Sequence, residues 1–102
     1  IYHNGVVITF LKYLRKGKIG DWATEKGDIH LEQIAKHPQS KVDTSEVLQS
    51  FFRMFDTDVH LSVRSSNRRA RQFYKKNGMK SVGKISWSGG NLLGVVYSHT
   101  TD

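Results

Sequence analysis

Cysteine, proline and long apolar runs are scarce or missing in this sequence. It has no cysteine, which excludes disulfides, thiolate metal sites and a cysteine nucleophile. Its one proline is Pro38, and no apolar run approaches the roughly 18 residues that a membrane helix needs. No signal-peptide pattern opens the chain. Without such a run we expect no membrane partner. The first residue is Ile1, so we expect a processed or truncated product.

Acidic residues are outnumbered, because 9 Asp and Glu stand against 16 Lys and Arg, for a net charge of +7. A basic surface attracts anions such as nucleic acid, acidic lipid or a phosphorylated cofactor. Composition alone favours the simpler interpretation, a solvated basic surface. The length of 102 residues fits one domain with one modest core, which we place over residues 1–102.

Apolar periodicity predicts six strands and two helices. The strands are expected at residues 1–3, 6–14, 28–36, 59–64, 82–87 and 92–98, and the helices at 43–55 and 67–76. Asn4-Gly5 predicts a tight hairpin turn, because type I′ turns need positive φ. Residues 15–27, with three glycines, predict a polar loop. Because helices follow central strands, we expect an α/β fold with a mixed sheet.

The predicted helices begin at capping residues. Asp43 with Glu46 three residues later resembles a capping box, and Asn67 is a typical N-cap. Gly78 is expected to end the second helix. Simple alternation along residues 28–36 assigns side chains to two faces. Leu31, Gln33 and Ala35 are expected on one face, and His30, Glu32, Ile34 and Lys36 on the other.

Residues 59–79 read VHLSVRSSNRRARQFYKKNGM. This stretch resembles the pattern N-x-x-A-x-x-F-Y-x-x-x-G-(F or M) of the GCN5-related N-acetyltransferase (GNAT) superfamily. The matching residues are Asn67, Ala70, Phe73, Tyr74, Gly78 and Met79. Upstream, IHLEQIAKHPQ resembles the family's fourth strand and the proline after it. The resemblance spans nearly the whole chain and implies a GNAT-like acyl-CoA N-acyltransferase fold.

The chain departs from the family at its start. The usual opening strand and first two helices have no counterpart, and Ile1 falls near the end of the family's second strand. Those helices build part of the groove for the acceptor, so the resemblance does not identify the acceptor. An uncovered sheet face or edge would favour a homodimer.

The second departure is the pyrophosphate loop, which in the family reads Q/R-x-x-G-x-G/A. Here it reads Gln39-Ser40-Lys41-Val42-Asp43-Thr44, with both small positions replaced. Backbone amides at a helix N-terminus bind phosphate, and side chains hold the phosphate away from them. The Asp43 carboxylate adds a negative charge. A weakened pyrophosphate site and a plain capped helix start both remain open.

The resemblance also assigns roles to single residues. A backbone amide near Ile34, Ala35 and Lys36 would polarise the acetyl carbonyl, and Tyr74 would protonate the leaving thiolate. Asn67 matches an asparagine that contacts the pantetheine or phosphate arm. The full set of expected cofactor contacts is Ile34, Ala35, Lys36, Gln39, Lys41, Val42, Asp43, Thr44, Asn67, Ala70 and Phe73.

His30 and Glu32 are the expected bases, because some family members use a His or Glu on this strand to accept the amine proton. Each assignment has a plainer alternative. His30 and Glu32 would then be exposed polar residues, and Tyr74 a core aromatic beside Phe73. His30, Glu32 and His37 have no metal-site spacing, so we expect no metal.

The expected function is N-acetyl transfer from acetyl-CoA, by direct attack, to an amine-bearing small molecule or protein, in the cytoplasm. One alternative is a non-catalytic GNAT-like module that senses CoA or binds a protein. A second is a nucleic-acid-binding module, indicated by basic residues at positions 12–18 and 64–76. The chain lacks a basic motif interleaved with aromatics, so we do not expect a nucleic-acid partner.

Overall fold

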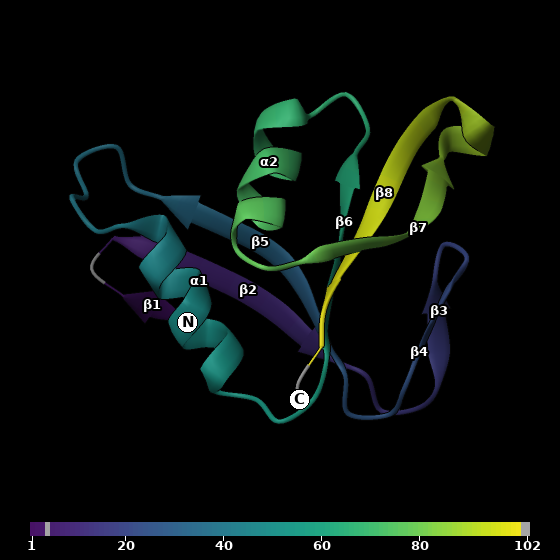
Figure 1. Cartoon of the computed structure of the whole chain (residues 1–102), viewed down its shortest axis with the longest axis horizontal. Helices are drawn as coiled ribbons and strands as arrows, with labels where there is room; N and C mark the ends of the chain where they lie inside the picture. The colour runs from purple at the N-terminus through teal and green to yellow at the C-terminus, as the bar shows by residue number, and fades with distance from the viewer. Residues whose placement is uncertain (4, 101–102) are drawn as a thin grey trace.

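The computed structural model describes residues 1–3 and 5–100 (Figure 1). In chain order the elements are β1 (Tyr2–His3), β2 (Val6–Lys12), β3 (Gly17–Ile19), β4 (Trp22–Thr24), β5 (Ile29–Lys36), α1 (Thr44–Arg53), β6 (Val59–Arg64), α2 (Arg68–Lys76), β7 (Lys80–Trp87), the 3₁₀ helix η1 (Ser88–Gly90) and β8 (Leu92–His99). No helix in this part of the chain has the length and apolar character required to cross a membrane.

Six strands form one sheet in the order β1-β2-β5-β6-β8-β7. Among the described residues, only β5 and β6 pair in parallel, and the other neighbours are antiparallel. The predicted mixed sheet is therefore confirmed. Tyr2 pairs with Val7 at the first turn, where Gly5 has a φ of +89°. The hairpin was predicted from Asn4-Gly5, and Asn4 itself lies outside the described residues.

The prediction of a plain polar loop over residues 15–27 was wrong, because β3 and β4 form a small hairpin there. Ile19 pairs with Trp22 across Gly20-Asp21, a two-residue connection with glycine first. Gly20 has a φ of +58°, and a Cβ there would lie 2.2 Å from the Lys84 carbonyl oxygen. Asp21 Oδ1 accepts a 2.8 Å hydrogen bond from the Lys84 N–H. The hairpin is thereby attached to β7.

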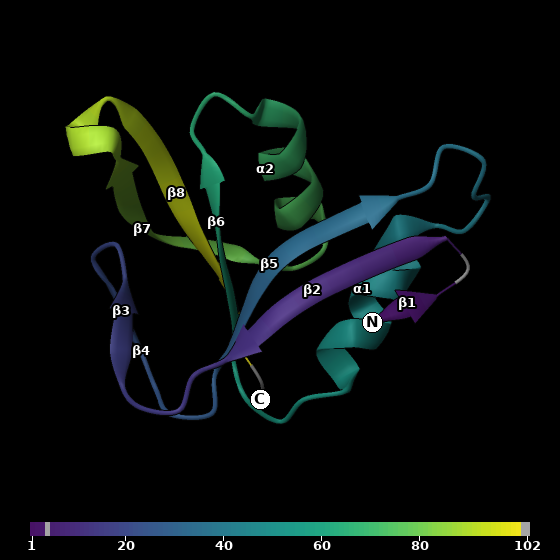
Figure 2. The same ribbon diagram turned by 180° about the vertical axis from the view of Figure 1, so that it is seen from behind.

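Both helices cover the same face of the twisted sheet (Figures 1 and 2). The predicted helices are confirmed with ends shifted by one or two residues, and Asp43 and Asn67 are their N-caps. Helix α1 has the apolar face that its spacing predicted, and Phe51 is 2% exposed. The Phe51 ring lies edge-on to Phe10 at 5.3 Å, which ties α1 to β2. One continuous core joins α1, α2 and the inner faces of β2, β5, β6 and β8.

The opposite face is covered unevenly. Over β6 and β8 the buried side chains include Val96, at 0%, and Ser98, at 2% exposure, and Ile19 of the hairpin is 4% exposed. Over β2 the face is open, since Val7 and Leu11 are 41% and 53% exposed. This open part carries a shallow hollow of about 630 Å³ beside β1, β2 and the end of β5.

Strand β5 does not follow the simple alternation that the sequence predicted. Thr9 pairs with Gln33 and Phe10 with Leu31, so Glu32 is an extra residue and forms a β-bulge. The bulge reverses the alternation. Leu31 and Ile34 therefore pack against the same core. The predicted division of the β5 side chains between two faces is wrong beyond Glu32.

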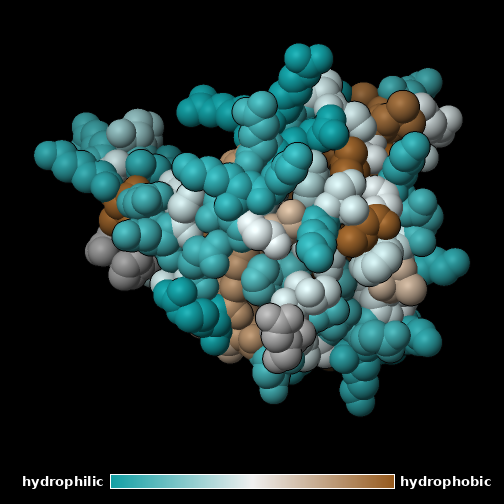
Figure 3. Space-filling view, viewed as in Figure 1, coloured by the Kyte–Doolittle hydropathy of each residue, from teal (hydrophilic) through white to brown (hydrophobic). Residues whose placement is uncertain are grey.

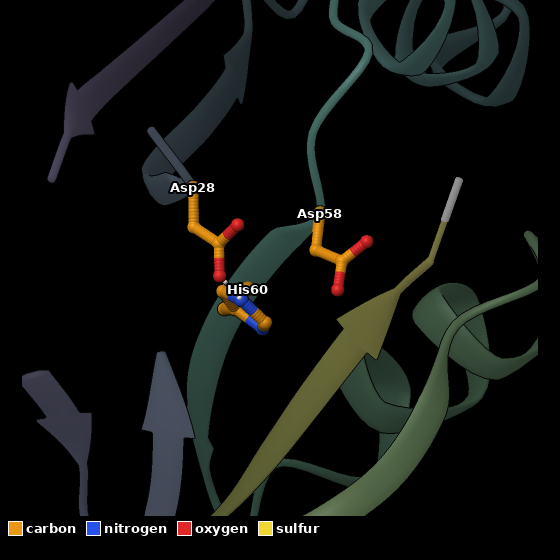
Figure 4. A group of neighbouring side chains, drawn as sticks. All are labelled: Asp28, Asp58 and His60. Carbon is orange, nitrogen blue, oxygen red and sulfur yellow. Dashed lines mark hydrogen bonds and ion pairs between the residues drawn. The ribbon is translucent and has the colours of Figure 1, made fainter. Parts of the chain in front are cut away.

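A buried polar pair lies at the start of β5 and β6. Asp28 is 6% and His60 1% exposed, and Asp28 Oδ2 lies 2.8 Å from His60 Nε2 (Figure 4). The same carboxylate oxygen accepts a hydrogen bond from the Glu25 N–H. Asp58 stands nearby, and the ligand-type atoms of Asp28, Asp58 and His60 lie within 4.8 Å of one another. The Asp28–His60 pair holds the first residues of the two parallel strands together.

This pair generates a stability prediction. Asp28→Ala leaves the buried His60 ring without its hydrogen-bond partner, and a buried polar group left unpaired costs about 1 to 3 kcal/mol. Glu25→Gln is the matched loss of one negative charge, because Glu25 forms an exposed 3.8 Å ion pair with Lys16. That pair contributes at most about 1 kcal/mol. Urea denaturation measures both variants, and equal, small losses would contradict a joining role for Asp28.

Candidate cofactor site

The parallel pair at the centre of the sheet opens along its length. Pairing joins Ile29 to Val59 and His30 to His60, and no later pair is formed within the described residues. Beyond these positions β5 and β6 diverge (Figures 1 and 2). The separation begins next to the Glu32 bulge, which bends β5 away. From Leu31 onward, the edge of β5 that faces β6 has no strand partner, so its backbone groups are available to a ligand.

The predicted carbonyl-polarising segment lies on this diverging part of β5. Ile34 packs against the core, whereas Ala35 and Lys36 are exposed near the end of the strand. In a strand, successive backbone N–H groups point to opposite edges. At least one amide of residues 34–36 is therefore directed toward the open side of β5.

Tyr74 lies on α2, on the face of the sheet that both helices cover. It is half-buried and packs against the core with Ala70 and Phe73. Its ring lies 5.4 Å from the Phe73 ring and 6.4 Å from the Tyr97 ring. Burial raises the pKa of the Tyr74 phenol. The hydroxyl is therefore protonated throughout the neutral range and can donate a proton, so packing in the core and proton donation are compatible roles.

Asn67 is exposed at the start of α2, and its side-chain oxygen accepts a 3.2 Å hydrogen bond from the Ala70 N–H. The predicted capping role is confirmed. Since the oxygen is used by the cap, the side-chain amide N–H groups are the part of Asn67 suited to contact a ligand.

The degenerate pyrophosphate loop leads into the start of α1, where a carboxylate of the chain itself already accepts a hydrogen bond from a backbone N–H. Gln39 and Lys41 are exposed, whereas Val42 packs against the core. The Asp43 carboxylate accepts a 2.9 Å hydrogen bond from the Ser45 N–H in the first turn of α1. Such N–H groups are the donors that a phosphate would otherwise use. A pyrophosphate at Thr44 would have to approach or displace this carboxylate.

The two predicted bases differ in their surroundings. His30 is half-buried, and its Nδ1 lies 2.7 Å from the Tyr13 hydroxyl. Burial lowers the pKa of His30, although the Glu32 charge opposes the effect and nearby His60 adds to it. His30 also lies in the paired, closed part of the two strands. Glu32 is exposed at the bulge, where the strands begin to diverge.

The Asp28–His60 pair was missed by sequence reasoning. Alternation in β6 places Val59, Leu61 and Val63 in the helix-side core, so His60 is expected on an outer, solvated face. The burial of His60 depends on chain segments that sequence patterns did not place there. The group of Asp28, Asp58 and His60 contains none of His30, Glu32 and His37, the three residues considered from the sequence.

Comparison with known proteins finds no matching protein-family profile and no matching curated protein. Solved structures do match. The chain is similar to Arabidopsis thaliana NAA60 in complex with acetyl-CoA, with a TM-score of 0.64 and 12% identity over 93% of this chain and 63% of that one. It is similar to the Escherichia coli ribosomal-protein-S18-alanine N-acetyltransferase, with a TM-score of 0.59 and 17% identity over 78% and 59% of the two chains. A Bacillus cereus GNAT-family acetyltransferase gives a TM-score of 0.57 and 14% identity over 72% and 54%.

These similarities show that the chain has a GNAT-like mixed α/β fold, as the sequence predicted. The chain spans between 54% and 63% of the length of these similar structures. Because sequence identity is low in each case, the similarity establishes the architecture alone.

The Asp43 cap generates a binding prediction. Asp43→Asn keeps a good N-cap and removes the negative charge, so CoA should bind more tightly, by about threefold to tenfold at low salt. Glu25→Gln removes one negative charge in the β4–β5 connection and should leave CoA affinity unchanged. Isothermal titration calorimetry measures both. An unchanged affinity in Asp43→Asn, or equal tightening in both variants, would place the cofactor phosphates elsewhere.

Proposed function

We propose that this chain is an N-acetyltransferase that transfers the acetyl group of acetyl-CoA to a primary amine by direct attack. The observation that carries the proposal is the divergence of β5 and β6 directly after two paired positions, with Tyr74 packed over the same sheet. The similarity in fold to NAA60 in complex with acetyl-CoA supports the choice of co-substrate. The Asn67 to Met79 motif supports the role of Tyr74.

In the proposed reaction the residues of β5 and α2 act on opposite ends of the transferred group. A backbone amide of residues 34–36 donates a hydrogen bond to the acetyl carbonyl oxygen and stabilises its developing negative charge. The amine nitrogen forms a bond to the carbonyl carbon as the carbon–sulfur bond breaks. Tyr74 gives its phenolic proton to the departing sulfur. The proton lost by the amine passes to a base on β5.

Glu32 is the base that the geometry favours. Its side chain is exposed at the bulge, beside the diverging part of β5, whereas the His30 ring contacts the Tyr13 hydroxyl in the paired part. A lowered His30 pKa keeps that ring neutral at pH 7, so His30 can accept a hydrogen bond there. We propose that Glu32 takes the amine proton and that His30 supports the closed end of the strands.

The Asp43 cap supports a second candidate function, a non-catalytic module that senses CoA or binds a protein. An internal carboxylate on the first turn of α1 weakens any pyrophosphate contact there. The two candidates differ in turnover. An acetyltransferase releases free CoA when acetyl-CoA and an amine are supplied, and a sensor binds acetyl-CoA without consuming it.

The role of Tyr74 is tested by Tyr74→Phe, which keeps the ring in the core and removes only the hydroxyl. Turnover should fall by roughly 10²- to 10⁴-fold, the range for a lost acid catalyst, while CoA affinity stays nearly unchanged. Tyr2→Phe is the matched control, because Tyr2 is 72% exposed. A thiol-release assay over a panel of amines and peptides gives the rates. Normal turnover in Tyr74→Phe would make Tyr74 a core residue only.

A further inference from the structure

Charge is divided very unevenly along the chain. Residues 1–58 contain eight Lys and Arg and eight Asp and Glu, whereas residues 59–100 contain eight Lys and Arg and no Asp or Glu. The cationic residues of the second segment are Arg64, Arg68, Arg69, Arg71, Lys75, Lys76, Lys80 and Lys84. The whole net charge of the protein therefore originates in one continuous stretch of sequence.

The fold makes this stretch a unit in space as well. Strands β6, β8 and β7 are consecutive in the sheet, and α2 packs over them (Figure 1). In the same view hydrophilic side chains cover the surface over α2 (Figure 3). With no carboxylate of its own, the unit has a positive potential that no internal ion pair offsets.

A groove runs along one side of α2 and over the start of β7. It consists of two adjoining hollows of about 280 and 510 Å³ that share Arg71, Lys75 and Tyr97. Its remaining lining residues are Arg68, Gln72, Gly78, Met79, Lys80 and Ser81. The groove thus places four cationic side chains along one path.

Arg71 is held in place at the middle of this groove. Its Nε donates to the Tyr97 hydroxyl at 3.3 Å, and its Nη1 donates to the Ser65 carbonyl oxygen at 3.0 Å. These contacts orient the guanidinium before any ligand arrives, which reduces the entropy lost on binding. Helical rotation of about 100° per residue places Gln72 and Lys75 on a different side of α2 from Tyr74. The outer part of the groove, at Gln72 and Lys75, therefore faces away from the proposed acetyl-CoA site, whereas Tyr97 lies beside Tyr74.

The lining of the groove indicates the chemistry of its ligand. The apolar lining residues Met79 and Tyr97 are only 2% and 4% exposed, so no apolar side chain offers an anchor. Peptide recognition depends on such anchors, whereas a phosphate backbone requires only charge and N–H donors. Arginine is well suited to phosphate, because its planar fork donates two hydrogen bonds at once.

We propose that this groove binds the phosphate backbone of a nucleic acid without reading its bases. The missing aromatic basic motif, which argued against nucleic acid in the sequence, concerns base stacking. Tyr97 is buried, so the groove offers no exposed ring for a base. Backbone binding depends on charge and is independent of acetyl transfer. A chain that binds no nucleic acid could therefore still transfer acetyl groups, and an inactive chain could still bind nucleic acid.

The test uses a fluorescein-labelled DNA duplex of random sequence and fluorescence anisotropy at several KCl concentrations. Lys75→Gln with Lys80→Gln removes two charges from the groove. Lys18→Gln with Lys26→Gln removes two charges from exposed positions in the first 58 residues. The two variants have the same net charge, and loss of exposed lysines should leave the unfolding temperature of both nearly unchanged.

The groove variant should bind the duplex at least about tenfold more weakly at low salt, with the slope of log affinity against log salt reduced by nearly two. The matched variant should retain the affinity and slope of the wild type. Equal weakening in both variants would show diffuse attraction and overturn the proposal. So would no binding by the wild type at about 50 mM KCl. If a labelled polyglutamate of equal charge binds more tightly than the duplex, the ligand of the groove is an acidic protein segment and the proposal is overturned.

Discussion

The architecture depends on a parallel strand pair that is joined at one end only. Ile29 and His30 of β5 pair with Val59 and His60 of β6, and the Asp28–His60 contact holds that end closed. Full pairing along β5 would give a continuous sheet with no open edge at its centre. No pairing would separate the sheet into two halves. The short pair, with the bulge after it, produces the divergence on which the proposed chemistry rests.

Two further features keep the two halves of the sheet in place. Helix α1 inserts Phe51 into the core against Phe10 of β2, so the β1–β2–β5 half is fixed by aromatic packing. In the sequence the β3–β4 hairpin lies between β2 and β5, yet it is attached to β7 by the hydrogen bond from the Lys84 N–H to Asp21. The hairpin therefore connects the two halves across the face that the helices leave uncovered. A cofactor between β5 and β6 would bind to a frame fixed from both faces.

The predictable parts of this fold are those in which local pattern and tertiary burial agree. Helix α1 is predictable because its regularly spaced apolar residues form the face that packs against the sheet. Helix α2 is predictable because Asn67 and Gly78 mark its ends. The bulge was not predicted, since Glu32 fits simple alternation in sequence and becomes the extra residue only through its pairing with β2. The burial of His60 was not predicted either, because it depends on segments brought together by the fold. The Gly20-Asp21 turn was present in the sequence but was obscured by the polar residues around it.

For the candidate site, the motif on α2 could be located from the sequence, whereas its electrostatics could not. The Asp43 cap was expected from the capping-box pattern, whereas the burial that raises the Tyr74 pKa depends on tertiary packing. Burial raises the pKa of Tyr74, which keeps the hydroxyl protonated at neutral pH, and the Asp43 carboxylate occupies an N–H group at the start of α1. If the proposed function holds, the Asp43 carboxylate weakens the contact with the cofactor phosphates at α1, so more of the acetyl-CoA affinity must come from the diverging strands and α2.

The most direct test of this account is a titration of isotope-labelled protein with acetyl-CoA, followed by the backbone amide signals in NMR spectra. The account predicts saturable shifts in the amides of residues 32–36 on β5, with smaller shifts in β6 and at the start of α2. Signals of the β3–β4 hairpin should remain in place. Saturable binding with shifts confined to the groove beside Lys75 and Lys80, or no shifts at all in the folded protein, would contradict it.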